Sequence, residues 1–508
     1  MAWLTLLIVL PLISAAVAWF VGDGMARQVG LVGAVVTLGV AIAMALAYVP
    51  NSSAFLQFTE QHEWISSFGA SYSVGVDGIA LVLILMSTAL VPVTMLAGWH
   101  EMEDASSTGR GSIRGYVVLT LILESMMVGV FAATDVFLFY VFFEAILIPM
   151  YFLIGRYGGA KRQYASIKFL LYSLLGGLLM LASLIGLWVQ AKQQFGHGTF
   201  DWVTLSHLRL DPTTEKWLWA GFFVAFAVKA PLVPVHTWLP DAAAEATPGS
   251  ATLMVGVLDK IGTFGMLRYL LVLFPAASLW ATPAVIVLSI VSIFYGALLA
   301  IGQSDIKRLI AYTSVSHFGF ITLGIFAFTS QSQSGATLYM VNHGFSTAAL
   351  FLVAGFLISR RGSRFIEDFG GVNKVAPLLT GAFLLAGLSS LALPGMSSFV
   401  SEFLVLVGTF TRYPSEAVIA TFGIVFAALY ILLMYQRSMT GMPGEAVRST
   451  VTEMNKREIV AIAPVLAIII ALGFVPQVLL NVINPTIDKT MHVVAVADPK
   501  PALEGTNS

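Results

Sequence analysis

The sequence predicts an all-α polytopic membrane protein. Of its 508 residues, 58% are hydrophobic and only 10% are charged, and the mean hydropathy is +0.87. A soluble globular domain is about a quarter charged, so this composition excludes that class. Apolar runs of about 20 residues, each long enough to cross a bilayer, recur along the chain.

Measured against that length, the sequence predicts fourteen (14) transmembrane helices. They lie near 2–21, 28–49, 77–98, 115–134, 135–155, 166–190, 217–239, 249–273, 280–301, 308–328, 334–359, 377–411, 416–436 and 458–481. The first lacks a basic leader, and we interpret it as a retained span rather than a signal peptide. The seventh contains Pro231 and Pro234, and the over-long twelfth contains LALPGMSS, so we expect broken helices 7 and 12.

Basic residues are distributed unevenly between the predicted loops. If the N-terminus is outside, the odd-numbered loops are cytoplasmic and hold sixteen of the 26 Lys and Arg: Arg27, Arg110, Arg114, Arg156, Lys161, Arg162, Lys307, Arg308, Arg360, Arg361, Arg364, Lys374, Arg437, Arg448, Lys456 and Arg457. The positive-inside rule then places both termini in the periplasm. We expect the polar tail 482–508, which contains Lys489 and Lys500, to be mobile.

Several function classes are excluded by what the sequence lacks. With no cysteine it cannot bind an iron–sulfur cluster through thiolates, form a disulfide or attach haem covalently. The net charge of −1 gives no electrostatic support for nucleic acid binding. No P-loop or dinucleotide-binding glycine motif is present. We therefore expect no redox centre and no cofactor in this chain.

Three ionisable residues lie in the middle of apolar segments: Glu144, Lys229 and Lys260. A charge at membrane depth costs at least a few kcal/mol, so it persists where it is paired, hydrated or part of an ion or proton path. Buried lysine and carboxylate groups can both exchange protons. The structural alternatives are that Glu144 caps a backbone group or supports assembly, and that Lys229 only neutralises it.

Lys260 follows Asp259, and adjacent helix positions point about 100° apart. Only one of the two can therefore point along the axis that Lys229 occupies. We take Lys260 as the relay residue and expect Asp259 to meet another helix or subunit.

Polar residues continue through the second half of the chain. His317 and His343 lie in neighbouring segments, where imidazole can relay protons near neutral pH. They can instead be hydrogen-bonded structure or, less readily, a metal pair, since no cysteine or carboxylate cluster accompanies them. Glu402 follows Pro394–Gly395 by about two turns and is the expected outlet of the path.

Other polar residues have structural interpretations. Glu124 can form an interhelical hydrogen bond, and Asp135 is expected to cap the fifth segment. Lys168 and Arg268 lie near segment ends and can snorkel to the interface. A further polar cluster is predicted at the cytoplasmic mouth from His236, Asp241 and Glu245.

Spacing hints at an internal repeat. Glu144 and Lys229 are 85 residues apart, as are His317 and Glu402, and the pairs are offset by 173 residues. That offset is about five helices, an odd number, so one copy would be inverted relative to the other.

Long motifs carry a family resemblance over about residues 70–440. They are FAATDVFLFYVFFEAILIPMYFLIGRYG, VKAPLVPVHTWLPDAAAEATPGSATLMVG, SHFGFITLGIF, NHGFSTAALFLVAG and LALPGMSSFVSEFLVL. These closely resemble the antiporter-like subunits of respiratory complex I, the NADH–quinone oxidoreductase, and best its bacterial M-type subunits. The resemblance implies two inverted five-helix repeats and proton translocation driven by quinone reduction elsewhere in the complex.

The resemblance also implies an organisation and partners. The expected parts are helices 1–3 (1–113), the first repeat (114–274), the second repeat (275–440), and helix 14 with the tail (441–508). NADH, FMN, iron–sulfur clusters and quinone are expected in partner subunits. The expected partners are other membrane-arm subunits, including two sister antiporter-like subunits, in the bilayer of the bacterial inner membrane.

Roles carry over by matching positions. Glu144 and Lys229 match the family's Glu–Lys pair, Lys260 its central lysine, and His317 and His343 the polar residues of the second half-channel. The position of Glu402 is a glutamate in M-type subunits and usually a lysine in their relatives.

Two positions depart from the family pattern. Ala243 replaces the usual histidine of PDAH, and Asp259 a usually apolar residue. The alternatives are a subunit of an Mrp-type cation/proton antiporter or membrane-bound hydrogenase, and a membrane scaffold with an inactive channel.

Overall fold

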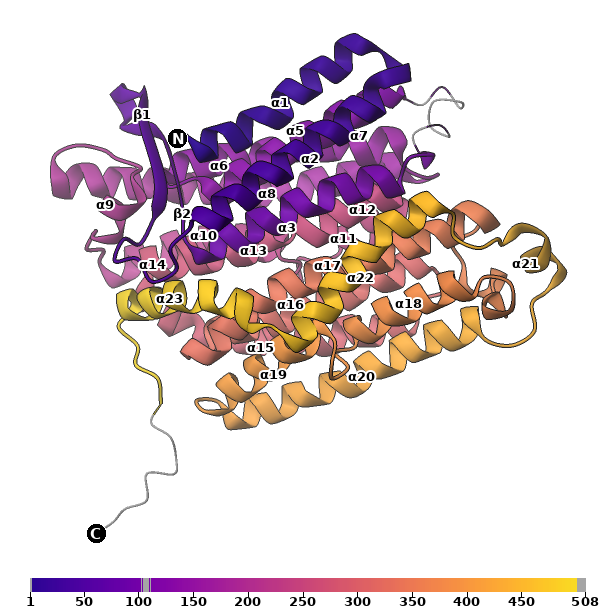
Figure 1. Ribbon diagram of the computed structural model, residues 1–508. Helices are drawn as coiled ribbons and strands as arrows, with labels where there is room; N and C mark the ends of the chain where they lie inside the picture. Colours follow the sequence, from indigo (N-terminus) through magenta and orange to yellow (C-terminus); the bar gives the residue numbers. More distant parts are fainter. Residues whose placement is uncertain (1, 102, 104–108, 110, 500–508) are drawn as a thin grey trace.

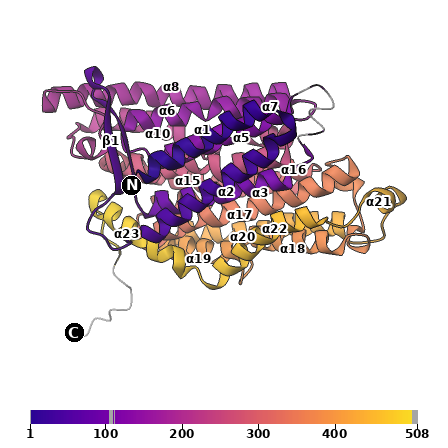
Figure 2. The same ribbon diagram turned by 45° about the horizontal axis from the view of Figure 1, so that its top comes forward.

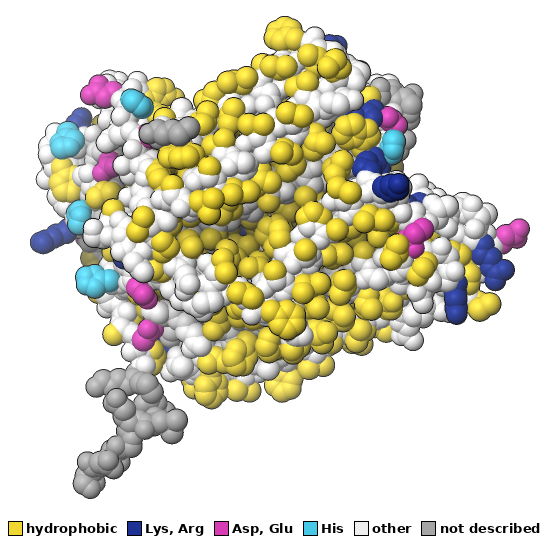
Figure 3. Space-filling model, in the orientation of Figure 1, with side chains coloured by type: hydrophobic (Ala, Val, Ile, Leu, Met, Phe, Trp, Pro, Cys, Tyr) yellow, Lys and Arg dark blue, Asp and Glu magenta, His cyan; other side chains and the backbone are white. Residues whose placement is uncertain are grey.

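The computed structural model describes residues 2–101, 103, 109 and 111–499; Arg110 and Lys500 lie outside this part. Most long helices run side by side between two polar ends, and a broad hydrophobic surface separates those ends (Figures 1 and 3). Within the described residues, twelve helices are long and apolar enough to cross a membrane. The number is thirteen if the bent pair 366–374 and 377–390 is one span. The chain is thus a polytopic helical membrane protein.

The N-terminal part contains a hairpin that the all-α expectation lacks. Its elements are α1 (Trp3–Val21), α2 (Asp23–Ala47), β1 (Gln57–Ile65), β2 (Ala70–Val76) and α3 (Gly78–Ala97). The strands pair antiparallel, with His62 opposite Tyr72, and Gly69 takes a φ of +67° at the turn. The hairpin lies at the same end of the molecule as the N-terminus (Figure 1).

The first half of the remaining chain contains a kinked and an interrupted helix. Its elements are α5 (Ile113–Ala132), α6 (Val136–Ala145), α7 (Leu147–Tyr157), α8 (Arg162–Phe195), α9 (Trp202–Ser206), α10 (Pro212–Lys229) and α11 (Trp238–Glu245). Asp135 caps α6 as predicted, accepting from the N–H groups of Phe137 and Leu138 at 2.9 Å each. The predicted seventh segment is split between α10 and α11, because Pro231 and Pro234 offer no N–H to continue the helix.

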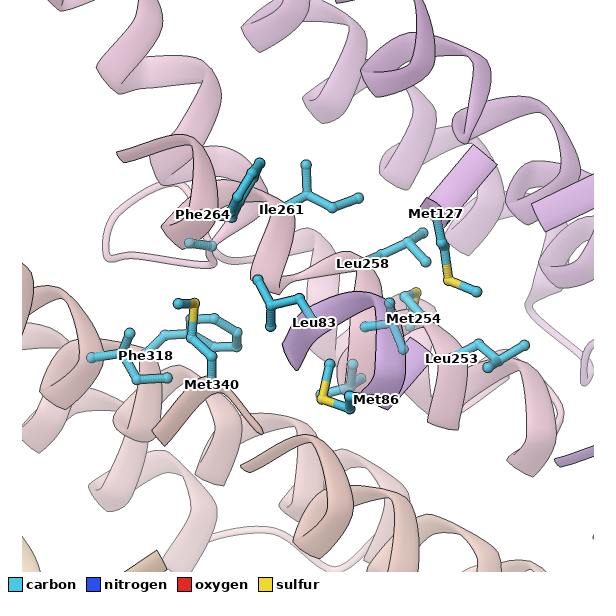
Figure 4. Packing of buried hydrophobic residues seen from close by; sticks show 14 of the residues in the cluster. Leu83, Met86, Met127, Leu253, Met254, Leu258, Ile261, Phe264, Phe318 and Met340 are labelled. Atoms are coloured by element: carbon cyan, nitrogen blue, oxygen red, sulfur yellow. The ribbon is translucent and has the colours of Figure 1, made fainter. Parts of the chain in front are cut away.

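The predicted eighth segment is a continuous but irregular helix at the centre of the molecule. It consists of α12 (Pro248–Leu253), a π turn (Met254–Leu258), α13 (Lys260–Gly265), a second π turn (Met266–Leu270) and α14 (Leu271–Leu273). Except at Pro248 it is buried, among residues of α3, α5, α16 and α17 (Figure 4). Each π turn adds a residue to a turn and so changes the face to which later side chains point.

The second half repeats the pattern of long and interrupted helices. Its elements are α15 (Pro275–Ile301), α16 (Ile306–Phe326), α17 (Ser330–Arg361), α18 (Pro377–Ser390), α19 (Ser397–Phe410) and α20 (Pro414–Met439). The predicted twelfth segment is interrupted between α18 and α19. Gly395 has a φ of +90° there, a conformation that favours glycine.

The C-terminal part corrects the expectation of a mobile tail from 482. It consists of α21 (Glu445–Thr450), α22 (Lys456–Phe474) and α23 (Gln477–Val494). One face of α23 is buried, through Ile483, Ile487, Met491 and Val494, and packs against α3 and α17. These residues recur every three or four positions, so the segment is an amphipathic helix despite its polar composition.

Candidate functional site

Glu144 lies at the end of α6, just before the kink that begins α7. Its carboxylate faces α8 at Gly177, where an added Cβ would collide with it. The side chain is partly exposed, but Oε1 is buried and has no hydrogen-bond partner within the protein. The helix pair thus holds a carboxylate that no protein donor satisfies.

Lys229 is the last residue of α10 and is only 1% exposed. Its Nζ has no hydrogen-bond partner and lies 4.7 Å from the ring centroid of Phe143 and 5.9 Å from that of Phe169. Aromatic faces attract a cation without accepting its proton. Glu144 is the charge that acts most strongly on Lys229, followed by Asp259, although neither carboxylate lies within 4.0 Å of the ammonium.

Side chains satisfy the backbone at the break that follows Lys229. The indole N–H of Trp238 donates to the Val228 carbonyl at 2.8 Å, and Ser292 accepts from the Val233 N–H at 3.0 Å. Non-helical backbone at membrane depth persists where it is satisfied in this way. The break therefore holds Lys229 at a fixed helix end.

Lys260 lies on α13 and is fully buried. Its Nζ donates to the Val255 carbonyl at 2.6 Å and lies 2.7 Å from His343 Nδ1 on α17. Phe318 covers the ammonium, with its ring centroid 5.2 Å from Nζ. The central lysine and one predicted histidine are thus directly hydrogen-bonded.

His317 on α16 is the next ionisable neighbour of His343 in space. The two imidazole rings meet edge to face, with centroids 5.2 Å apart. Nε2 of His317 lies 3.2 Å from the hydroxyl of Tyr430 on α20. Tyr339 on α17 also packs against His317, with ring centroids 5.9 Å apart.

Glu402 lies on α19, after the break, and is 4% exposed. The Tyr339 hydroxyl donates to its Oε2 at 2.9 Å, while Oε1 has no partner within the protein. Asn342 donates to the Ser397 carbonyl at 2.7 Å and so ties α17 to the first turn of α19. Tyr339 therefore joins Glu402 to the histidines.

The fold thus brings the six predicted residues into two groups, one around Lys229 and one from Lys260 to Glu402, where α10 packs against α13. We call the two groups together the relay row. In order along it they are Glu144, Lys229, Lys260, His343, His317 and Glu402. The sequence did not single out Tyr339 and Tyr430, because a tyrosine in an apolar helix resembles ordinary core. Among the described residues no group of three or more His, Asp or Glu could hold a metal ion.

Asp259 lies within the chain, so of the two expected neighbours, another helix or another subunit, it is a helix that surrounds it here. It is fully buried within the chain, and neither carboxylate oxygen has a hydrogen-bond partner. The charges acting on it are those of Lys260 and Lys229. Glu124 on α5 is equally buried, and its expected interhelical hydrogen bond is not formed.

Arg268 also differs from its prediction. Instead of reaching the interface, it is 3% exposed and forms a buried ion pair with Asp77, with Nη2 and Oδ2 2.7 Å apart. Lys168 likewise pairs with Asp241 at 2.7 Å. Ion pairs of this kind hold together the helix ends that carry them.

Ion pairs join the two halves of the chain at the end opposite the termini. Asp241 binds Arg308 at 2.8 Å as well as Lys168. Arg364 binds Glu245 at 3.0 Å and Asp305 at 2.7 Å. Asp241 and Glu245 of the predicted mouth cluster belong to this network, whereas His236 packs against Tyr295 instead.

A pocket of about 450 Å³ opens beside this network. Glu101, Glu245, Lys307 and Arg364 are among the residues that line it. Glu101 lies outside the spans, and burial raises the pKa of its carboxyl to about 7, against the opposing effects of the Gly249 N–H and Lys307. A carboxyl with such a pKa exchanges protons near neutral pH.

Known proteins resemble this chain over most of its length. Residues 133–427 match the family described as NADH:quinone oxidoreductase/Mrp antiporter, TM. The chain is 48% identical to NADH-quinone oxidoreductase subunit M of Mycobacterium tuberculosis, over 99% of this chain and 96% of that one.

Two solved structures share the fold. A chain of respiratory complex I from Thermus thermophilus with bound NADH matches with a TM-score of 0.87 and 29% identity, over 97% of this chain and 99% of that one. A chain of the Mrp complex from Dietzia sp. DQ12-45-1b matches with a TM-score of 0.83 over the same shares, but at 22% identity, which shows the fold alone. The chain therefore belongs to the NADH:quinone oxidoreductase/Mrp antiporter transmembrane family, among the antiporter-like M subunits of NADH–quinone oxidoreductase.

Proposed function

We propose that this chain is a proton-translocating membrane subunit of an NADH–quinone oxidoreductase, and that the relay row carries the protons. The observation that supports this most strongly is the series of ionisable side chains from Glu144 to Glu402, all but the first of them buried, of which those from Lys260 onward are in direct contact. Burying so many ionisable groups is costly and is typical of proton paths in membrane proteins. A scaffold would have no need of them.

The row supports a division of roles. Glu144 and Lys229 form an electrostatically coupled pair, so a change in charge on one alters proton binding by the other. Lys260 passes a proton to His343 through their hydrogen bond. His317, Tyr339 and Tyr430 then connect the histidines to Glu402, which is the outlet beside the second break.

An organisation in fourteen helices with two inverted repeats, 114–274 and 275–440, fits local features of the fold. Asp135 and Asp305 each cap a helix that carries a member of the row, and each pairs across an isolated bridge, with Asp201 and Phe365 respectively. The long helices α8 and α17, of 34 and 32 residues, follow in each half. In the first half, the helix before the interruption ends at Lys229. In the second half, the helix after the interruption carries Glu402. Residues 1–113 and 441–508 flank the two repeats.

A periplasmic location of both termini, in a bacterial inner membrane, fits the distribution of charge. In the view of Figure 3 the Lys and Arg side chains gather mainly at the end opposite the N-terminus, and the histidines of that view lie mostly at the N-terminal end. The positive-inside rule makes the basic end cytoplasmic. The pocket beside Glu101 would then open to the cytoplasm, the side from which protons are taken up.

Redox chemistry is assigned to the partners. NADH, FMN, iron–sulfur clusters and quinone would belong to other subunits, and two sister antiporter-like subunits would be neighbours in the membrane arm. An Mrp-type role is less well supported, because the likeness to the Mrp chain is one of fold alone.

The test compares the assembled complex with and without Lys229. In membrane vesicles of equal complex content, Lys229→Ala should leave the complex assembled and lower proton uptake per NADH oxidised. Lys192→Ala is the control, because Lys192 is an exposed cation at the end of α8. Normal proton uptake by Lys229→Ala would support the scaffold alternative. Sodium uptake that depends on Lys229 would support the antiporter alternative.

A further inference from the structure

Asp259 lies between the two lysines of the relay row. The proton path that was predicted from the sequence does not include it. Its carboxylate is 0% exposed, and both oxygens lack a hydrogen-bond partner within the protein. Buried polar groups are almost always hydrogen-bonded, so an unpartnered buried carboxyl is an exception that needs a physical reason.

The faces of α13 show which way Asp259 points. Residues three apart lie on the same side of a helix. Gly262, three residues after Asp259, leaves no room for a Cβ against the backbone of Phe226 on α10 and of Ala230 just after it. Asp259 therefore faces α10 at the turn that ends in Lys229.

Lys260 occupies the adjoining face. Thr263, three residues after it, donates to the sulfur of Met340 on α17, and Lys260 itself contacts His343 on the same helix. The two consecutive residues thus point to opposite halves of the molecule, Asp259 to the first and Lys260 to the second.

The charges agree with this placement. Lys260 and Lys229 are the charges that act on Asp259, and Asp259 is the charge that acts on Lys260. Lys229 is acted on by Glu144 on one side and by Asp259 on the other. Without Asp259, no ionisable group would lie between the two lysines of the row.

We propose that Asp259 is the proton carrier that links Lys229 to Lys260, a role that rests on the proposed function of the relay row. The Lys229 ammonium transfers a proton to the Asp259 carboxylate, leaving a neutral amine and a carboxylic acid. After Lys260 has passed its own proton to His343, the carboxylic acid protonates the Lys260 amine. Asp259 returns to the carboxylate, and one proton has moved from Lys229 to Lys260.

The transfer needs a small movement or a bridging water, because no lysine nitrogen lies within 4.0 Å of the Asp259 oxygens. The surroundings permit one. A π turn precedes Asp259 directly, and Met86, Met254 and Met340 lie in the adjoining core (Figure 4). Methionine side chains adapt readily to such changes.

The test uses the assembled complex in vesicles, with proton uptake and NADH oxidation measured together. Asp259→Asn keeps the shape but cannot accept a proton, whereas Asp259→Glu keeps the carboxyl. Removing a proton-transferring group typically slows its step by on the order of 100-fold. We therefore expect Asp259→Asn to lose most of the coupled proton uptake and Asp259→Glu to recover much of it.

Glu124→Gln is the matched control, since Glu124 is an equally buried and unpartnered carboxyl on which no lysine, arginine or histidine acts. It should retain wild-type uptake. Wild-type uptake in Asp259→Asn, or equal losses in Asp259→Asn and Glu124→Gln, would overturn the proposal. Normal uptake in Lys229→Ala and Lys260→Met would instead overturn the relay itself, so the two failures are distinguishable.

Discussion

The two parts of the relay row hold their ionisable groups in different ways. Glu144 and Lys229 have buried polar atoms without hydrogen-bond partners, and the two groups interact electrostatically without a direct bond. From Lys260 onward, hydrogen bonds and ring contacts join the members, through His343, His317, Tyr339 and Glu402. On the proposed function, the first part would respond to charge and the second part would conduct protons.

The difference has an energetic basis. In a low-dielectric interior, an unpaired charge is strongly affected by any nearby change of charge. A hydrogen-bonded series of neutral and charged groups offers a defined path for a proton. Variants in the first part should therefore disturb coupling as a whole. Variants in the second part should block the path where they remove an exchangeable proton, and only slow it where they remove a single hydrogen bond.

Glu144→Gln should have a large effect. Without the carboxylate, Lys229 loses the charge that acts on it most strongly, so proton binding at Lys229 changes as well. We expect proton uptake to fall by on the order of 100-fold at this step, the scale of losing a proton-transferring group, with assembly intact. The check is proton uptake against NADH oxidation at equal complex content. Unchanged proton uptake would show that Glu144 does not take part in the relay row.

A double variant sharpens that prediction. If Glu144 and Lys229 act as one unit, Glu144→Gln combined with Lys229→Ala should lose little more than either change alone, because coupled residues are not additive. Losses that multiply would indicate two independent groups.

Glu402→Gln should lower the proton yield per quinone reduced or block coupled turnover, with Glu402→Asp milder. Glutamine keeps the shape and can still accept from the Tyr339 hydroxyl, but it cannot exchange the proton. The same vesicle assay measures both variants, and immunoblotting for the complex controls for assembly. Wild-type yield in Glu402→Gln would leave this residue a structural role.

Tyr339→Phe and Tyr430→Phe should have the smallest effects. Each removes one hydroxyl from the second part, to Glu402 at 2.9 Å or to His317 at 3.2 Å. A single hydrogen bond is worth about 0.5–1.5 kcal/mol, which corresponds to a roughly two- to tenfold slower step. Initial rates of proton uptake resolve such a change. A complete block by Tyr339→Phe would make the tyrosine itself a carrier.

Much of the fold and the members of the row can be predicted from the sequence. Apolar runs long enough to span a bilayer predict the helices, and the prolines after Lys229 predict a break. Each charged residue inside an apolar segment can be recognised as a candidate site residue. The helix α23 was missed because it buries only one face, and the hairpin 57–76 was missed because its first strand has no buried residue, so the composition of both resembles that of a loop.

The direction of side chains on the central helix could not be predicted. Two π turns, Met254–Leu258 and Met266–Leu270, change the helical phase around Lys260, and no sequence pattern announces them. That is why the sequence left open whether Asp259 meets a helix or another subunit, and why it did not predict the bond between Lys260 and His343. Tyr339 and Tyr430 were likewise hidden, since their roles depend on neighbours from distant helices.

The measurement that tests the account most directly is the proton-to-NADH ratio of Lys260→Met in vesicles of equal complex content. Lys260 is the member that connects the two parts of the row, and methionine fills its volume without carrying a proton. The account predicts that the complex assembles and that its proton uptake per NADH falls clearly below that of the wild type. A wild-type ratio at a wild-type rate of NADH oxidation would show that protons do not pass through the row.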